Sequence, residues 1–162
     1  KHSFFVSICL MYYAGLRASE VLSLSWLNIK DRHMRIIGKG NKERIVPICD
    51  ELQSILDEWY CRQQAFLNER PSLVVSNEDG SAVSGSFFRR MVKNVLMSCG
   101  CPYELAHPHA LRHSFATKMA AMGLSLLSLQ KILGHSSLNT TQVYVNLADS
   151  FASSEFFNLT SI

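Results

Sequence analysis

The stretch from residue 107 to 144 constrains the fold most, because helix-start and helix-stop signals divide it into short helices. Pro108 stands in a first helical turn, where proline's missing N–H costs nothing, and Gly123 ends that helix. Ser125 is placed to cap the next helix, which Gly134 ends. This punctuation predicts packed helices near the C-terminal end of the sequence.

Further helices and short strands are predicted from local patterns. Helices are expected at Ser3 to about Tyr13 with Gly15 as a left-handed cap, from Ser19 as N-cap, from Asp50 as cap to about Asn68, and from Ser84 or Ser86 to Met97. Apolar residues at helical spacing predict the buried stripe of the helix after Pro108: Leu111, Phe115, Met119 and Met122. Strands are expected at Trp26–Ile29, His33–Ile37, Arg44–Ile48 and Leu73–Val75, with a hairpin turn at residues 38–41. The expected class is α+β, mostly helical: a helical bundle with a small three-stranded antiparallel sheet.

Size and composition fit one globular domain. The chain has 162 residues, of which 48% are hydrophobic and 18% charged, and this balance excludes a disordered protein. Its five cysteines are odd in number and scattered, which predicts reduced thiols in a cytoplasmic protein.

The distribution of charge says more than the net charge of +3. Six Lys or Arg residues and two acids lie between Lys30 and Arg44, whereas seven acids and two arginines lie between Asp50 and Asp79. One basic and one acidic face fit nucleic-acid binding, although charge runs are also common on ordinary solvated surfaces.

His109, Arg112, His135 and Tyr144 together suggest a phosphate site. His109 and Arg112 are three residues apart, so they share a helix face in a first turn, where N–H groups favour an anion. Arg112 can hold two phosphate oxygens with its planar fork. A capping box at residues 139–142 opens the helix that carries Tyr144, a candidate nucleophile. Each residue alone has an ordinary structural explanation, and only the combination points to a site.

Five short motifs follow one another along the chain. They are Gly15-Leu16-Arg17-Ala18-Ser19-Glu20, Gly38-Lys39-Gly40-Asn41-Lys42-Glu43-Arg44, His109-Ala110-Leu111-Arg112-His113, Leu133-Gly134-His135, and Tyr144. In this order and spacing they resemble the tyrosine recombinases, the phage integrase family, and within it the Xer-like branch. The resemblance runs from about Leu10 to Leu147, and the five motifs in register are far more specific than any one of them.

The resemblance implies a site-specific DNA recombinase or integrase. Tyr144 would attack a DNA phosphodiester to form a 3′-phosphotyrosyl intermediate, and rejoining to exchanged strands would give integration, excision or dimer resolution. Arg17 and Arg112 would hold the non-bridging oxygens, with His135 as a third donor.

The resemblance also implies roles for the neighbouring residues. Lys39 would protonate the leaving 5′-oxygen, and His109 would assist proton transfer from the nucleophile. Glu20 would brace one of the arginines, and His113 would pack or brace. Neither a metal nor another cofactor is expected, because the phosphotyrosyl link stores the energy of the broken bond.

Double-stranded DNA is the partner that the resemblance implies. Phosphate contacts are expected from basic residues of the hairpin and of the helix before Met97: Lys42, Arg44, Arg89, Arg90 and Lys93. For the last three, a solvated surface is an equally good explanation. The amphipathic tail Asp149–Ile162 is expected to contact another subunit, in a homo-oligomer (a tetramer on DNA) or with a related recombinase. Packing of the tail on its own core is nearly as good an explanation, and no membrane contact is expected.

Residues 1–162 are expected to form a single C-terminal catalytic domain. The sequence begins with Lys1, and the first predicted helix follows without an entry loop. The helical DNA-gripping (core-binding) domain of the family is therefore expected in a segment that precedes this one.

Three other functions compete with this interpretation. A zinc-dependent hydrolase would use Cys99, Cys101, His107, His109 and His113, but Cys-x-Cys is not the usual ligand spacing. A non-catalytic DNA-binding module would bind DNA and form no covalent product. A type IB topoisomerase would share the chemistry but relax supercoils as a monomer.

Overall fold

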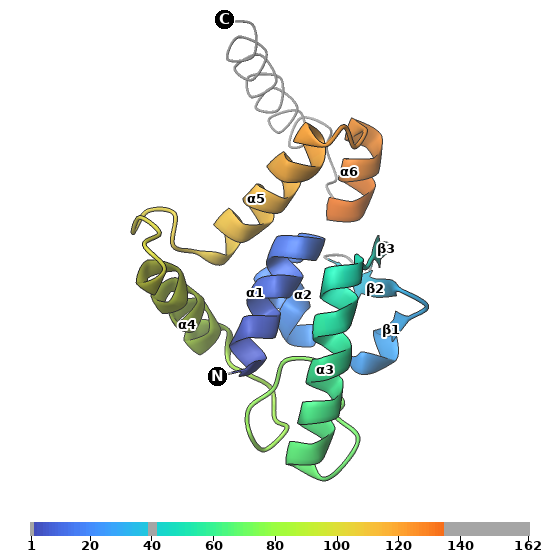
Figure 1. Cartoon of the computed structure of the whole chain (residues 1–162), viewed down its shortest axis with the longest axis vertical. Coiled ribbons are helices and arrows are strands. Elements are labelled where there is room, and N and C mark those ends of the chain that lie inside the picture. The colour runs from blue at the N-terminus through green and yellow to red at the C-terminus, as the bar shows by residue number, and fades with distance from the viewer. Residues whose placement is uncertain (1, 39–41, 135–162) are drawn as a thin grey trace, which may run out of the picture.

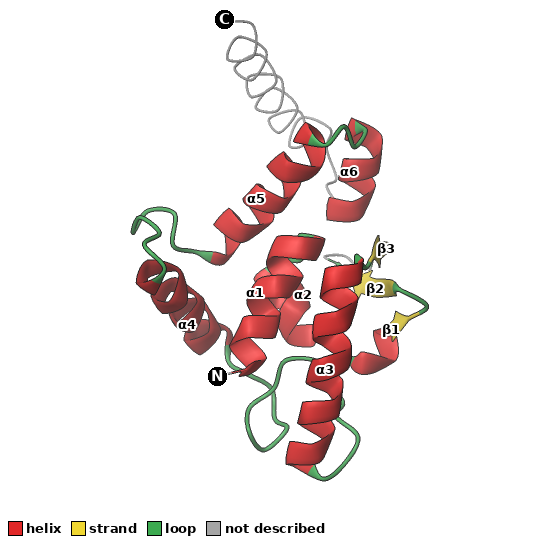
Figure 2. Ribbon diagram, viewed as in Figure 1, coloured by secondary structure: helices red, strands yellow, loops and turns green. Residues whose placement is uncertain are grey.

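The structure is a computed structural model that describes residues 2–38 and 42–134 (Figure 1). Within these ranges the elements are, in order, α1 (His2–Ala14), α2 (Ala18–Ser23), η1 (Trp26–Asn28), β1 (Ile29–Lys30), β2 (His33–Ile37), β3 (Glu43–Pro47), α3 (Asp50–Leu67), α4 (Gly85–Ser98), α5 (Pro108–Ala121) and α6 (Leu126–Leu133). The predicted class is confirmed: helices dominate, and the strands form one small antiparallel sheet at an edge (Figure 2).

Helix α1 lies at the centre of the molecule and packs against α3, α4 and α5 (Figure 1). Its buried side chains are Val6, Ser7, Cys9, Leu10, Met11 and Ala14. Because neighbours cover it on several sides, its apolar residues do not form the single stripe of a surface helix. Gly15 ends it with φ +64°, as predicted, and the chain turns directly into α2.

The sheet has the order β1-β2-β3, with Met34 opposite Val46 and Arg35 opposite Ile45. Alternate residues point inward, so Met34, Ile36 and Val46 are buried. Arg44 stands two residues before Val46 and therefore lies on the same inner face. This places a guanidinium group on the protein side of the hairpin.

Helices α5 and α6 share a second apolar cluster made of Phe115, Ala116, Leu129 and Leu133. Gly123 (φ +85°) ends the turn after α5, and the Ser125 hydroxyl accepts a hydrogen bond from the Ser128 N–H at 3.2 Å, as the capping prediction required. Helix α5 packs on α1, and α6 contacts β3. The turn between α1 and α2, the inner face of β3 and the end of α6 are thus brought together.

Two predicted strands are wrong. Of the predicted strand Trp26–Ile29, Trp26–Asn28 form the 3-10 turn η1, and the short strand β1 begins at Ile29. The run at residues 73–75 makes only an isolated bridge from Leu73 to Ser25. The bond from the Val74 N–H to Leu24 O belongs to this bridge, and the Val74 carbonyl accepts a hydrogen bond from the Trp59 indole.

Three predicted details at helix ends are also wrong. Arg17, not Ser19, is the N-cap of α2. Cys49 is the N-cap of α3, with Asp50 as its first residue. Met122 is 72% exposed because α5 ends at Ala121, so the apolar stripe stops one turn earlier than its spacing suggests.

Two further features concern the cysteines and the length of the helices. All five cysteines carry free thiols. Across residues 2–38 and 42–134, none of the helices combines the length and the apolar character needed to cross a membrane.

Candidate active site

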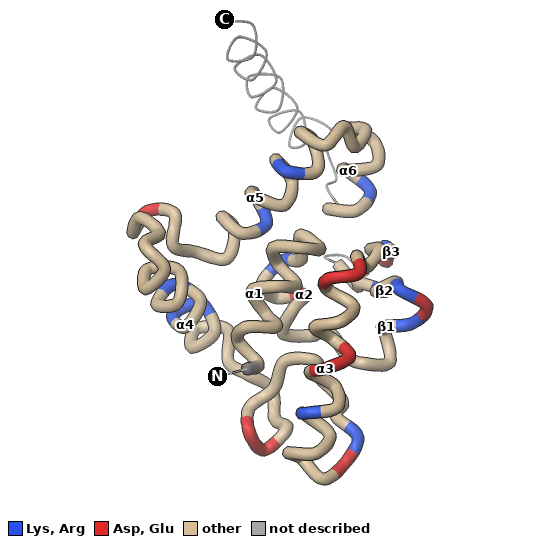
Figure 3. The backbone as a smooth tube through the Cα atoms, in the orientation of Figure 1, with Lys and Arg blue, Asp and Glu red and all other residues tan. Residues whose placement is uncertain are grey.

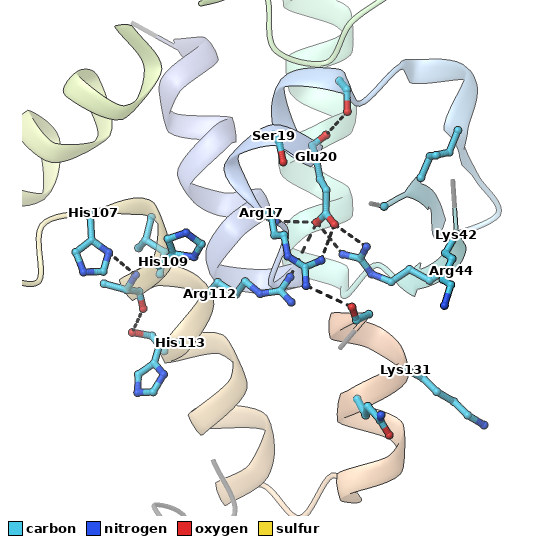
Figure 4. Close-up of a pocket in the computed structure, with 18 of the residues that line it drawn as sticks. Arg17, Ser19, Glu20, Lys42, Arg44, His107, His109, Arg112, His113 and Lys131 are labelled. Atoms are coloured by element: carbon cyan, nitrogen blue, oxygen red, sulfur yellow. Dashed lines mark hydrogen bonds and ion pairs between the residues drawn. The ribbon is translucent and has the colours of Figure 1, made fainter. Parts of the chain in front are cut away.

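A buried carboxylate, Glu20, gathers three arginines from three parts of the chain (Figure 4). Its side chain is 4% exposed. Arg17 Nη1 donates to Oε1 at 2.9 Å, and Arg44 Nη1 and Nη2 donate to Oε1 and Oε2 at 2.7 and 2.8 Å. Arg112 Nη1 lies 4.0 Å from Oε2. Glu20 is therefore the point on which the guanidinium groups are assembled.

Local helix chemistry holds Glu20 in place. Arg17 is the N-cap of α2, and its backbone N–H donates to Glu20 Oε2 at 2.8 Å. This is the return half of a capping box, in which the third helical residue satisfies the N–H of the cap. The carboxylate is thus held by a hydrogen bond within its own helix, in addition to its bonds with the distant arginines.

The carboxylate stays charged at neutral pH. Burial by itself raises the pKa of Glu20, but hydrogen bonds from Arg44 and Arg17 and the positive charge of Arg44 outweigh burial. The pKa is therefore held below the usual value of 4.5. A buried anion lies beneath a cluster of cations.

The same three arginines hold the end of α6. Arg44 Nε donates to Ile132 O at 2.7 Å, Arg112 Nη2 to Leu133 O at 2.6 Å, and Arg17 Nη2 to Gly134 O at 3.3 Å. The last carbonyls of a helix lack partners within the helix and carry partial negative charge, which cations satisfy. The last two carbonyls of α6 and that of its C-cap, Gly134, are satisfied in this way.

The three arginines differ in burial. Arg112 reaches from α5 to Gly15 O at 2.5 Å, and its side chain is 6% exposed. Arg44 is 9% exposed, whereas Arg17 is 34% exposed. Arg17 is therefore the most exposed of the three arginines and the one most accessible to a ligand.

The cluster opens into a cleft bounded by α2, the β2–β3 hairpin, the start of α5 and α6 (Figure 4). Its basic lining residues are Arg17, Lys42, Arg44, His107, His109, Arg112, His113 and Lys131. Glu20 and Glu43 are the acids among the described lining residues. A cleft with this balance of charge suits a polyanion.

Most of the sequence-predicted site residues that fall in the described ranges line this cleft. Arg17, Glu20, Lys42, Arg44, His109, Arg112 and His113 lie there together. Lys39, His135, Tyr144 and the tail Asp149–Ile162 lie outside the described residues. The structure thus assembles the arginine part of the predicted site.

The basic residues of α4 lie elsewhere. Arg89, Arg90 and Lys93 line a neighbouring hollow with Tyr103 and with His107, which also lines the cleft. Figure 3 shows this basic helix on the far side of α1 from the acidic residues of α3. Lys93 Nζ sits 3.2 Å from the centroid of the Tyr103 ring, and this ammonium group lowers the pKa of the Tyr103 hydroxyl. Contact of α4 with DNA stays a prediction.

Two residues of the cleft have roles that sequence reasoning missed. The ring Nδ1 of His107 accepts a hydrogen bond from the Ala110 N–H at 3.1 Å, so His107 caps α5. Arg44 is turned into the protein, and strand alternation with the apolar Val46 and Ile48 was the available signal. As for the zinc alternative, no three His, Cys, Asp or Glu side chains in the described part of the chain are placed to hold a metal ion.

Known proteins resemble this chain in sequence and in fold. The model of the phage integrase family matches residues 3–150. A tyrosine recombinase XerC from Haemophilus ducreyi is 39% identical over 143 residues, which cover 85% of this chain and 45% of the relative. The chain therefore spans about half the length of the curated relatives that it matches.

Solved structures show the same similarity. A XerH site-specific recombinase bound to its difH substrate, in a pre-cleavage complex, superposes with a TM-score of 0.75 at 29% identity, covering 88% of this chain and 42% of that one. The XerA recombinase superposes with a TM-score of 0.83 at 24% identity, covering 100% of this chain and 60% of that one, a likeness of fold.

Proposed function

Because this chain belongs to the phage integrase family, we propose that it is the catalytic domain of a site-specific DNA recombinase. One observation carries the proposal: Arg17 and Arg112, held by Glu20, form a fixed cationic cluster at the base of a basic cleft. The phosphodiester backbone of double-stranded DNA is the polyanion that such a cleft suits. The XerH structure bound to its difH substrate supports this assignment of partner.

In this proposal the arginines stabilise the transition state. Arg17, the exposed member of the cluster, binds a non-bridging oxygen of the scissile phosphate, and Arg112 supplies positive charge from beneath. Preorganised cations of this kind act most strongly on charge that builds up during reaction, here on pentacoordinate phosphorus. The ion pair with Glu20 keeps Arg17 oriented before DNA arrives.

The chemical steps use residues that the sequence motifs supply. The Tyr144 oxygen forms a bond to phosphorus while the bond to the 5′-oxygen breaks, and Lys39 protonates that oxygen as it leaves. His109, which lines the cleft, takes the tyrosine proton, and His135 donates to the phosphate. Attack by the 5′-hydroxyl of another strand reverses these steps and completes the exchange.

The wider setting belongs to the same proposal. Strand exchange brings several subunits together on DNA, as a homo-tetramer or with a related recombinase, through the tail Asp149–Ile162. A helical DNA-gripping domain acts together with this one. Lys42, Arg89, Arg90 and Lys93 add backbone contacts, and the free thiols support a cytoplasmic location.

The test is capture of a covalent protein–DNA adduct without divalent metal. The full-length protein is incubated with a randomised duplex library in EDTA and quenched with SDS, and the attached DNA is sequenced. We expect an enriched site joined through a 3′-phosphate, and no adduct from Tyr144→Phe. Specific DNA binding by folded protein without any adduct would instead identify a non-catalytic binding module.

The topoisomerase alternative needs its own measurement. The selected site is placed on a supercoiled plasmid and on a second, linear duplex. Products that join the two DNAs support recombination. Relaxation of the plasmid by monomeric protein, with no joined product, would overturn the proposal in favour of a type IB topoisomerase.

A further inference from the structure

We propose that Arg44 is a positioning residue, which sets Arg17 and the end of α6 through Glu20 and does not bind a DNA phosphate itself. The inference rests on the proposed recombinase function. It assigns Arg44 a role different from the phosphate contact that its place in a basic hairpin suggests.

The first support is that the side chain of Arg44 is hydrogen-bonded to the protein itself. All three of its side-chain nitrogens are bonded to protein acceptors: Nη1 and Nη2 to the two oxygens of Glu20, and Nε to Ile132 O. The side chain is 9% exposed. With each nitrogen already bonded and the side chain largely buried, this guanidinium group has little open surface with which to bind a phosphate.

The second support is the packing of Arg44 against Gly134. A Cβ on Gly134 would lie 2.9 Å from Arg44 Cδ and 3.3 Å from Nε and Nη1. Gly134 also has φ +64°, which ends α6 in the left-handed conformation. The missing side chain thus lets Arg44 lie across the end of the helix.

These contacts make Arg44 the link between three parts of the site. It joins β3 to the first turn of α2 through Glu20 and to the last turn of α6 through Ile132. Without Arg44, Glu20 would retain only Arg17 and Arg112 as positive partners among the described residues. Arg17 is the more exposed of these two, so its side chain is the one that can move closer to Glu20. Arg17 would then be drawn away from the phosphate position, and the end of α6 would lose one of its caps.

The test compares Arg44→Ala with Arg35→Ala in the full-length protein. Arg35 is an arginine of the same hairpin, but its side chain is 54% exposed and faces Glu43 at 3.6 Å. The DNA is the site selected by wild-type protein, nicked a few nucleotides 3′ of the scissile phosphate so that the released fragment diffuses away. Adduct formation is measured at saturating DNA, and affinity is measured across a salt series.

We expect Arg44→Ala to slow adduct formation at saturating DNA by about 100-fold, the usual effect of a slightly misplaced catalytic group. DNA affinity should change less than about threefold, with the salt slope unchanged, because no phosphate contact is removed. Arg35→Ala should form adduct at the wild-type rate. Arg44→Lys, which keeps the charge but not the two-pronged fork, should restore only part of the rate.

A second pair of variants tests the inference independently, in case Arg44→Ala does not fold. Gly134→Ala keeps Arg44 but displaces it, whereas Gly123→Ala places a methyl at a similar φ (+85°) with no atom within 4 Å. Gly134→Ala should slow adduct formation and Gly123→Ala should not. The double variant Arg44→Lys with Gly134→Ala should lose less than the product of the two single effects, because both disturb one arrangement.

The outcomes separate this inference from the proposed function. A normal rate at saturation, with weaker binding and a salt slope reduced by about one, would show that Arg44 contacts a phosphate and would overturn the inference alone. Wild-type protein that binds DNA but forms no adduct would sink the recombinase function, and the inference would fall with it.

Discussion

Arg44 and Glu20 join β3 to α2 by two parallel hydrogen bonds of 2.7 and 2.8 Å, although the residues are 24 positions apart. Paired bonds fix the plane of the carboxylate as well as its position. Arg17 bonds to the Glu20 oxygen that also accepts from Arg44 Nη1, so the orientation of one acid sets the orientation of both arginines.

Glu20→Gln should destabilise the protein in a pH-dependent way. The substitution leaves the buried Arg44 and Arg112 without their anion, and loss of one partner of a buried pair costs about 3–5 kcal/mol. The folded-state pKa of Glu20 is lowered, so its stabilisation is complete above the ordinary pKa of 4.5 and is lost as the pH falls through the folded value.

Urea unfolding between neutral pH and about pH 3 checks this prediction. The difference in free energy of unfolding between wild type and Glu20→Gln should narrow as the pH falls. Glu69→Gln, at an exposed position, is the matched control and should show little difference at any pH. If the difference in free energy of unfolding between wild type and Glu20→Gln stayed constant down to about pH 3, Glu20 would not be charged in the folded protein.

Arg112→Ala should cost more stability than Arg17→Ala. The Arg112 side chain is 6% exposed and satisfies Gly15 O and Leu133 O, so its loss should cost about 3–5 kcal/mol. Arg17 is 34% exposed, and its loss should cost about 1 kcal/mol. Chemical denaturation of both variants measures the difference, and equal costs would mean that Arg112 is not the structural anchor.

Local chemistry made much of the fold predictable from sequence. Helix ends at Gly15, Gly123 and Gly134 follow from glycine's access to positive φ, and the hairpin follows from two β-rich runs around a glycine-rich turn. These signals act within a few residues, so the sequence itself carries them. They were enough to give the class and most element boundaries.

The site was harder to predict because its contacts are long-range. The bond from Arg44 to Ile132 spans 88 positions, and no local pattern specifies it. Strand alternation placed Arg44 inward with Val46, but a basic stretch suggests outward-facing cations, and the two signals conflict. The predicted strand at residues 73–75 was wrong for a similar reason: one of its backbone carbonyls, that of Val74, is bonded to the side chain of Trp59, 15 positions away.

Phe88→Ala should be far more costly than Phe87→Ala, although the two residues are adjacent in α4. Phe88 is 0% exposed and Phe87 is 36% exposed. Removal of a buried phenyl ring leaves a cavity and typically costs about 3–5 kcal/mol, whereas the half-exposed ring should cost about 1 kcal/mol. Thermal melts of the two variants give the comparison, and similar melting temperatures would contradict the full burial of the Phe88 ring.

Gly15→Ala tests the turn that presents Arg17 and receives Arg112. An added Cβ would lie 2.4 Å from Phe115 Cδ1 and 2.8 Å from Cε1, so the ring would have to move within the α5–α6 cluster. The backbone is also left-handed there, with φ +64°, which adds about 1 kcal/mol of strain for alanine. Overpacking of a buried ring typically costs about 1–3 kcal/mol more.

Gly123→Ala is the matched control for this variant, because its backbone is also left-handed (φ +85°) and no atom lies within 4 Å of the new methyl group. Urea unfolding should therefore show a loss for Gly15→Ala that exceeds that of Gly123→Ala by the cost of displacing Phe115. Because Gly15 O also accepts from Arg112, the double variant Gly15→Ala with Arg112→Ala should lose less than the sum of the single effects. Strictly additive losses would mean that the turn and Arg112 are energetically independent.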